Sequence, residues 1–271
     1  MIRITALNVY PVKGCRGIAL DSARIAATGF EHDREWLITR PDGRFMTQRE
    51  EPRLALIETA LAGEGLRLRV PGGAELRVPF AAQGKEVEVT CWKDRCAAFD
   101  AGDEAAEFLA SYLGAPYRLV RFDARRKRPS NAQWTPGVEA LNQFSDGFPW
   151  LLISEGSLED LNSRLSRKLP MNRFRPNIVV SGLPPFGEDS IHELVTDGVR
   201  LRRAKPCTRC IVTTTDQATA TRDGDEPLRT LAKFRFNREL KGVVFGQNLI
   251  LIEGSGAQLR VGQELELSGS L

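Results

Sequence analysis

Two cysteines separated by two residues, Cys207 and Cys210 in the stretch KPCTRCIVTTTD, are the side chains of this sequence best suited to metal or redox chemistry. Such a pair can form a disulfide, half of a structural zinc site or a redox dithiol, or it can supply one thiolate to a metal. Lys205 and Arg209 lie beside the pair and threonines occupy 213–215, so a thiolate here would have cations and hydrogen-bond donors around it. This setting favours a single soft ligand for a redox metal, with the polar residues turned toward an anionic cofactor.

The other interpretations of the pair are still open from the residues alone. A zinc site needs four Cys or His ligands, and the second cysteine pair, Cys91 and Cys96, flanks a tryptophan in a strand-like run, while His32 and His192 have no ligand spacing. A redox dithiol is expected at the start of a helix, whereas IVTTTD, which follows the pair, is β-branched and predicts a strand. Buried cysteines can also act simply as small hydrophobic residues.

Composition limits the class of protein. With 271 residues, of which 42% are hydrophobic, the chain can bury a large core without disulfides. Five cysteines and a strand-like start, MIRITALNVY, favour free thiols in a reducing cytoplasm, and no apolar window is long enough for a membrane span or anchor. A net charge of +3 is too small for a general nucleic-acid binder. The basic stretch 121–130 is interpreted as a solvated interdomain segment in preference to a phosphate or partner contact.

Alternating and β-branched runs predict that strands position these residues. Three helices are expected, at 103–113 with Asp103 as N-cap, from Ser157 to about residue 168, and at about 226–236. The prediction is therefore a mainly β fold with α decoration (α+β). A boundary in the basic, proline-containing stretch gives two domains, 1–122 and 123–271. The strand-like runs are IRITALNV, GLRLRV, EVEVTCW, YRLVRF, VRLRRA and AQLRVGQELEL.

Eight motifs in a fixed order carry a resemblance that covers nearly the whole chain. They are YPVKGCRG (10–17), HDREWLI (32–38), FMTQREEPRL (45–54), SDGFPWLLISEGSLEDLN (145–162), NRFRPNIVVSG (172–182), EDS (188–190), KPCTRCIVTTTD (205–216) and FGQN (245–248). The sequence resembles MOSC-domain proteins with the associated N-terminal β-barrel, the family of the mitochondrial amidoxime reducing component and its bacterial relatives. The resemblance implies an N-terminal β-barrel-like domain packed on a MOSC β-barrel domain, and a bound molybdenum cofactor.

The resemblance also implies which residues hold that cofactor. Cys210 would be the protein's ligand to molybdenum and a catalytic residue, with two further sulfurs from the pterin dithiolene, and Cys207 would have no assigned role. The matching cofactor contacts are Lys13, Gly14, Arg34, Asp146, Gly147, Arg175, Asn177, Thr208, Arg209 and Cys210.

The chemistry of these residue types agrees with an anionic, polar cofactor. Lys13, Arg34 and Arg175 come from separate segments and could surround a phosphate and a pterin, while Gly14 would permit close approach of the backbone. Arg49 could contribute, or could pair with the neighbouring glutamates at the surface.

Asp189 is the carboxylate expected to take part in catalysis. It could orient a cationic or hydroxylamine-like substrate or accept a hydrogen bond from the pterin, and capping of its loop is an equal alternative.

The implied activity is reduction of N-hydroxylated compounds, such as amidoximes or hydroxylamino bases. Some relatives carry a C-terminal ferredoxin-like domain, but this sequence has no C-x4-C-x2-C spacing, so a separate electron donor of ferredoxin, flavodoxin or cytochrome type is expected. Two alternatives are a cofactor carrier or sulfur-handling module without turnover of its own, and a retained fold with no metal.

Overall fold

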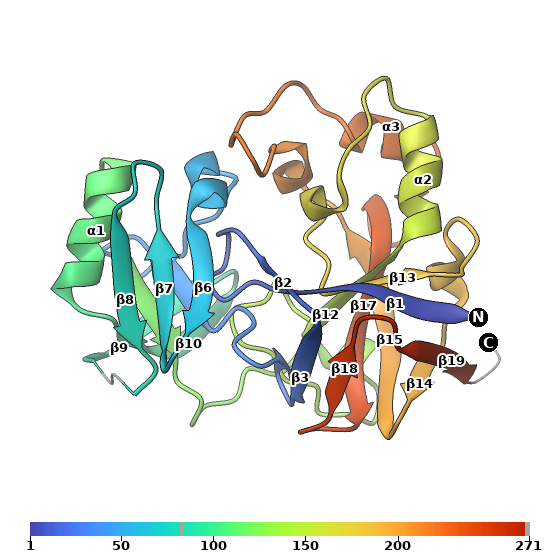
Figure 1. The fold of residues 1–271 in the computed structure, drawn as a ribbon, viewed down its shortest axis with the longest axis horizontal. Coiled ribbons are helices and arrows are strands. Elements are labelled where there is room, and N and C mark those ends of the chain that lie inside the picture. The colour runs from blue at the N-terminus through green and yellow to red at the C-terminus, as the bar shows by residue number, and fades with distance from the viewer. Residues whose placement is uncertain (82–83, 269–271) are drawn as a thin grey trace.

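Strands dominate the structure, a computed structural model that describes residues 1–81 and 84–268. Figure 1 shows two parts side by side, with β6 to β10 and α1 in one part and the longer barrel strands, α2 and α3 in the other. The prediction of a mainly β fold with α decoration is confirmed.

Seven strands close into a barrel in the order β12-β13-β1-β19-β14-β15-β17, and β17 pairs again with β12. Closure leaves no unpaired barrel edge. Every neighbouring pair is antiparallel except β12 and β13. The barrel strands are β1 (Ile2–Val9), β12 (Trp150–Ser154), β13 (Ile178–Ser181), β14 (Glu193–Thr196), β15 (Val199–Thr208), β17 (Gly242–Glu253) and β19 (Glu264–Ser268).

Strand β1 shows how sequence alternation fills the barrel core. Ile2 and Ile4 point inward, but the next buried residues are Leu7 and Val9, which breaks strict alternation. The register with β13 shifts between Ile4 and Ala6, so an irregularity there moves the inward face by one residue.

The second part contains two smaller sheets that share an apolar core with α1 (Asp103–Leu113). Helix α1 buries Ala105, Leu109 and Leu113, as its periodicity predicts, and ends at Gly114, which is left-handed. The strands are β5 (Trp36–Thr39), β11 (Arg118–Phe122), β10 (Asp94–Asp100) and β9 (Glu86–Cys91) in one sheet, and β6 (Glu58–Ala62), β7 (Gly65–Arg69) and β8 (Glu75–Pro79) in the other.

The first strands of the chain belong to the barrel part. Strand β1 lies between β13 and β19, β2 (Ile18–Leu20) pairs with β1, and β3 (Ser22–Ala26) joins β4 (Gly29–Phe30) to β18 (Gln258–Arg260). The chain therefore starts in the barrel, builds the smaller sheets and returns (Figure 1). The division into 1–122 and 123–271 remains a prediction, and β1 and β3 pair across it with strands from the second segment.

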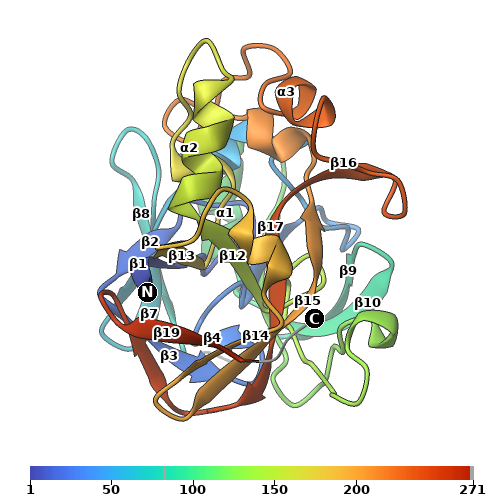
Figure 2. The ribbon, with the colours of Figure 1, turned by 90° about the vertical axis from the view of Figure 1, so that its right-hand side faces the viewer.

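The helices differ from their predicted bounds. The N-cap of α1 is Gly102, not Asp103, and α2 spans Glu155–Ser163 instead of starting at Ser157. Ser154 caps α2, since its Oγ accepts a hydrogen bond from the Ser157 amide at 3.1 Å. Helix α3 covers Leu228–Ala232 and is followed by the short strand β16 (Phe236–Asn237), so it is shorter than expected. Figures 1 and 2 both place α2 and α3 at one end of the barrel.

The strand predicted for IVTTTD is wrong. Strand β15 ends at Thr208, and Ile211–Thr214 form a 3-10 helix. The hydroxyls of Thr213 and Thr214 donate to the carbonyls of Cys210 and Ile211, three residues earlier, at 2.9 and 2.8 Å. These local bonds give the backbone an alternative to a sheet.

The basic stretch 121–130 is largely neutralised. Arg121 pairs with Glu35, Arg125 with Asp123 and Glu86, Lys127 with Glu139, and Arg128 with Asp94. Arg128 is buried, contrary to the expectation of a solvated segment. Within the described ranges, no helix has the length and apolar character needed to cross a membrane.

Candidate cofactor site

A cavity lies at the junction of the two parts and collects the residues implied by the resemblance. Its wall comes from the loops around Lys13, Arg34 and Thr47, from 145–151, from 173–177 and from 207–213. All ten expected cofactor contacts line it: Lys13, Gly14, Arg34, Asp146, Gly147, Arg175, Asn177, Thr208, Arg209 and Cys210. Their contacts to a cofactor remain predictions, but their convergence is a property of the fold.

Asp189 does not line this cavity. Its carboxylate pairs with Arg235 at 2.7 Å and accepts a hydrogen bond from Gln247 Nε2 at 2.5 Å. Because both oxygens are engaged within the barrel part, the geometry does not support a role in orienting a substrate.

Arg34 is held between the two parts of the molecule. It has a left-handed backbone (φ 48°) just before β5, and its Nη1 donates to Asp33 Oδ2 at 2.6 Å and to Asn177 Oδ1 at 2.9 Å. Burial raises the pKa of Asp33, although Arg34 and the amide of Tyr10 oppose that shift. Arg34 therefore already has a carboxylate partner, Asp33, and hydrogen bonds hold its side chain in place in the cavity wall.

Arg175 differs from Arg34 because no described carboxylate pairs with it. Its backbone is also left-handed (φ 56°), its guanidinium lies 4.3 Å from the Tyr10 ring centroid, and Nη1 donates to Gln217 Oε1 at 3.3 Å. Burial and the charge of Arg34 lower the pKa of Arg175. A desolvated cation without a counter-ion is costly, so the position is suited to an anionic ligand.

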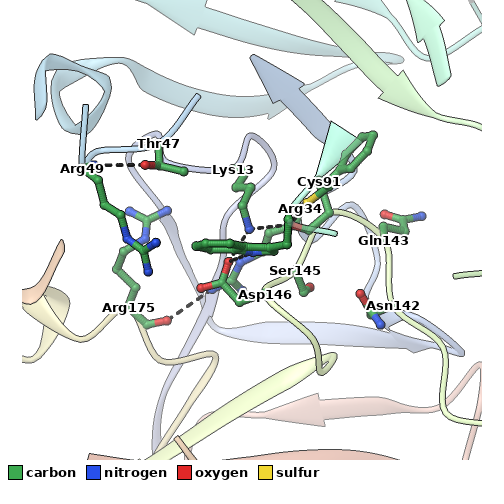
Figure 3. A network of polar contacts seen from close by, with 12 residues as sticks. Lys13, Arg34, Thr47, Arg49, Cys91, Asn142, Gln143, Ser145, Asp146 and Arg175 are labelled. Carbon is green, nitrogen blue, oxygen red and sulfur yellow. Dashed lines mark hydrogen bonds and ion pairs between the residues drawn. The ribbon is translucent and has the colours of Figure 1, made fainter. Parts of the chain in front are cut away.

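Lys13 and Asp146 form an ion pair across the cavity, as Figure 3 shows. Lys13 Nζ also donates to the Phe144 carbonyl at 2.7 Å, and Trp92 Nε1 donates to Asp146 Oδ1 at 3.1 Å. Asp146 is largely exposed, and Lys13 and Trp92 hold its pKa below the usual range of an aspartate.

Arg128 supports the loop that carries Asp146. Its Nη1 lies within hydrogen-bond distance of Asn142 Oδ1 (2.6 Å), the Gln143 carbonyl (2.5 Å) and the Ser145 carbonyl (2.7 Å). A guanidinium offers several donors in a fixed plane, so one side chain can shape an irregular segment.

The two cysteines both reach the cavity as free thiols. Cys207 lies at the end of β15, where Arg209 Nη1 donates to its Sγ at 3.0 Å, and Cys210 precedes the 3-10 helix. No group of three or more His, Cys, Asp or Glu residues in 1–81 and 84–268 is arranged to hold a metal ion. A metal here would take thiolate from the chain and its other ligands from a cofactor or solvent.

Two glutamines, Gln48 and Gln217, form a reciprocal hydrogen-bonded pair that joins the two parts of the molecule. Gln48 Nε2 donates to Gln217 Oε1 at 2.9 Å, and Gln217 Nε2 donates to Gln48 Oε1 at 2.8 Å. Gln48 Nε2 also donates to the Gly14 carbonyl at 2.6 Å, and Arg222 reaches the Gln48 carbonyl. Because Gln217 also contacts Arg175, this pair connects the loop after the cysteines to the cationic wall.

Several lining residues were not predicted from the sequence. Gln48 and Arg173 stood within recognised motifs and Trp92 within a strand-like run, but nothing in their local pattern indicated a cavity. Arg49 does not pair with Glu50 or Glu51 in the described structure; its guanidinium lies 4.5 Å from the Trp92 ring centroid. Figure 3 shows Arg49 and Arg175 extending from different segments of the cavity wall.

The donor set fits an anionic, metal-bearing cofactor. The described cavity wall contains six cations and one carboxylate, Asp146. Arg173 Nε and Arg209 Nε are buried without a partner in the described structure, and so is Ser145 Oγ. Gly14 has a left-handed backbone (φ 87°), and its main-chain atoms form part of the cavity wall. The unpaired donors and the excess positive charge suit a phosphate and a polar pterin. The two thiols suit a sulfur-binding metal. The six cations are Lys13, Arg34, Arg49, Arg173, Arg175 and Arg209.

Comparison with known proteins agrees with this geometry. The MOSC N-terminal beta barrel domain matches residues 1–116, and the MOSC domain matches residues 140–266. Mitochondrial amidoxime-reducing component 1 from Homo sapiens is 36% identical over 281 residues, covering 98% of this chain and 83% of the relative. The Mus musculus protein of the same name is 35% identical with 98% and 82% coverage. Mitochondrial amidoxime reducing component 2 from Bos taurus is 36% identical with 86% and 72% coverage.

Proposed function

The chain belongs to the MOSC-domain family that includes the mitochondrial amidoxime-reducing components, and from this premise we propose that it is a molybdenum cofactor-dependent reductase of N-hydroxylated compounds. The observation that carries the proposal is the meeting of Arg175, a partly buried cation with no carboxylate partner among the described residues, with two free thiols in one cavity. Anion recognition and sulfur ligation are the two requirements of this cofactor.

The residues of the chain have separate tasks in this proposal. Arg175 and Arg49 neutralise the anionic cofactor, Arg34 and Asn177 donate and accept hydrogen bonds at its edge, and the Cys210 thiolate binds molybdenum. When bound, such a cofactor supplies two-electron oxygen transfer. The overall reaction converts R–NHOH, two electrons and two protons to R–NH2 and water.

The electrons must come from a second protein in this proposal, of ferredoxin, flavodoxin or cytochrome type. A cofactor carrier or sulfur-handling module is the alternative function, because the same thiol could hold a cofactor for delivery. Steady turnover with an artificial electron donor separates a reductase from a carrier, which would release cofactor without consuming substrate.

The proposal is tested by molybdenum content and turnover together. Protein from a cofactor-competent host is expected to contain about one molybdenum per chain by elemental analysis, with Cys210→Ala losing it and Cys207→Ala keeping it. The dye-reduced wild type should convert benzamidoxime to benzamidine. Absence of molybdenum from the wild type, or loaded protein that converts no N-hydroxylated compound in a broad panel, would overturn the reductase assignment.

A further inference from the structure

A groove opens next to the cofactor cavity and shares part of its wall. Thr47, Arg49, Trp92, Asp146 and the segment 147–148 line both, and the groove has a volume of about 910 Å³. That is the size range of sites for small organic molecules. Since the two spaces share this wall, a molecule in the groove lies next to the cavity.

The carboxylates of the groove are already neutralised. Glu50 pairs with Arg40 and Arg44, and Asp94 pairs with Arg128. Asp146 pairs with Lys13 as described above.

Three cations of the same groove have no such partner. Arg49, Lys93 and Lys205 form no ion pair with any carboxylate in the described ranges, and all three line the groove. The space therefore has an excess of uncompensated positive charge, which favours an anionic group on whatever enters.

The groove also presents flat aromatic surfaces. Trp134 ends the 3-10 turn Ala132–Trp134, and its ring centroid lies 5.1 Å from Lys205 Nζ. Trp92 packs on Phe45 with ring centroids 4.9 Å apart. Aromatic faces beside a cation suit a planar ring that bears negative charge, since the ring stacks while the cation binds the substituent.

Lys205 is close to the reactive end of the cavity along the chain. It precedes Cys207 by two residues on β15, a distance of roughly 7 Å for extended backbone, and Asn248 of the paired strand donates to its carbonyl at 3.3 Å. A ring of ordinary size can thus span from Lys205 to the mouth of the cofactor cavity.

We propose that this groove is the substrate site and that Lys205 and Trp134 determine specificity for planar aromatic N-hydroxylated compounds with an anionic substituent. The reaction of such a compound rests on the proposed reductase function, whereas the binding preference of the groove does not. Lys205 binds the anionic substituent, Trp134 supports the ring, and the N-hydroxyl group points to the shared wall.

The kinetic test uses one ring with three charges: 4-carboxybenzamidoxime, benzamidoxime and 4-(trimethylammonio)benzamidoxime. We expect kcat/KM to be about three- to five-fold higher for the anion than for the neutral compound and lowest for the cation, as one partly exposed ion pair allows. Lys205→Gln should lower kcat/KM for the anion to about the value for benzamidoxime, which removes the preference. The matched control Lys168→Gln, at an exposed lysine in the segment after α2, should keep the preference. Equal kcat/KM for all three compounds would overturn the inference.

A binding measurement separates this inference from the proposed reaction. Trp36 and Trp150 are 0% and 1% exposed, so a ligand in the groove can quench mainly Trp92 and Trp134. Titration with 4-carboxybenzamide should quench the wild type at lower concentration than benzamide does, and Trp134→Leu should weaken both titrations. If the carboxylate gives no advantage here, the groove does not select anions. If the carboxylate does strengthen binding but the protein turns over no N-hydroxylated compound, the binding inference stands and the reductase assignment fails.

Discussion

Tyr10 illustrates how one residue organises the cationic wall. Its ring centroid lies 4.3 Å from the guanidinium carbons of both Arg34 and Arg175, and its hydroxyl donates to the Pro176 carbonyl at 3.1 Å. The ring separates charges that would otherwise repel and offers each a cation–π contact. A Cβ at Gly17 would lie 2.4 Å from this ring, which explains the glycine at that position.

The burial of Tyr10 predicts a specific alkaline sensitivity. Burial raises the pKa of Tyr10 to about 12, against the opposing charges of Arg175 and Arg34. Between pH 10 and 12 the unfolded state releases this proton while the folded state retains it, so the free energy of unfolding falls by up to about 1.4 kcal/mol per pH unit. Well below pH 10, Tyr10 contributes nothing to the pH dependence of the free energy of unfolding.

Denaturant unfolding of the wild type and Tyr10→Phe at several pH values checks this expectation. Tyr10→Phe should be about 1 kcal/mol less stable near pH 8, because the hydrogen bond to Pro176 is lost. Its stability should decline less steeply above pH 10. Parallel curves for the two proteins across this range would show that the Tyr10 hydroxyl does not titrate with a raised pKa.

At the scale of elements, the site depends on segments that have little regular structure. The loop before β12 carries Asp146 and is shaped by Arg128, while the cysteines follow the end of β15. Rigid strands position the loop ends, and buried polar contacts determine the loop conformations between them.

Arg128 is predicted to be essential to its loop. Arg128→Met removes three loop hydrogen bonds and leaves Asp94 unpaired, so a loss of about 2–4 kcal/mol in the free energy of unfolding is expected from denaturant titration. Limited proteolysis should cut within 142–147 faster than in the wild type. Arg126→Met, at an exposed neighbour in the same basic stretch, is the control and should change neither measurement. Wild-type stability and proteolysis in Arg128→Met would contradict this role.

At the scale of the whole molecule, the cavity lies where the chain leaves the barrel part after β4 and returns to it at β12. Gln48 and Gln217, 169 residues apart in sequence, close this junction with two mutual hydrogen bonds. Both side chains are buried, so each amide depends on the other for part of its hydrogen bonding.

This dependence predicts strong coupling in a double-mutant cycle. Gln48→Leu and Gln217→Leu should each lower the free energy of unfolding by about 1–3 kcal/mol, because each leaves a buried amide without its partner. The double variant should lose at least about 1 kcal/mol less than the sum of the two single losses. Gln48→Leu combined with Gln133→Leu, an exposed glutamine, should be additive. Additivity of the Gln48 and Gln217 substitutions would refute the coupling.

Local patterns in the sequence determined the strands, the position of α1 and the motifs that identify the family. They did so because side-chain alternation, periodicity and motif spacing are properties of neighbouring residues. The same patterns failed at IVTTTD, where threonine hydroxyls bond back to the chain, and at the start of α2, where Ser154 instead of Ser157 is the cap. Both failures concern competing local hydrogen bonds that composition does not rank.

Only the tertiary structure decided which charges at the site are free. Arg34 and Arg175 look equivalent in the sequence, but Asp33 neutralises Arg34, while Arg175 has no ion-pair partner among the described residues. Asp189 was likewise a candidate catalytic carboxylate with loop capping as an equal alternative, and its contacts with Arg235 and Gln247 are visible only in the fold. Pairing and desolvation depend on residues brought together from distant segments, so the ionic state of a site follows from the fold and not from any one motif.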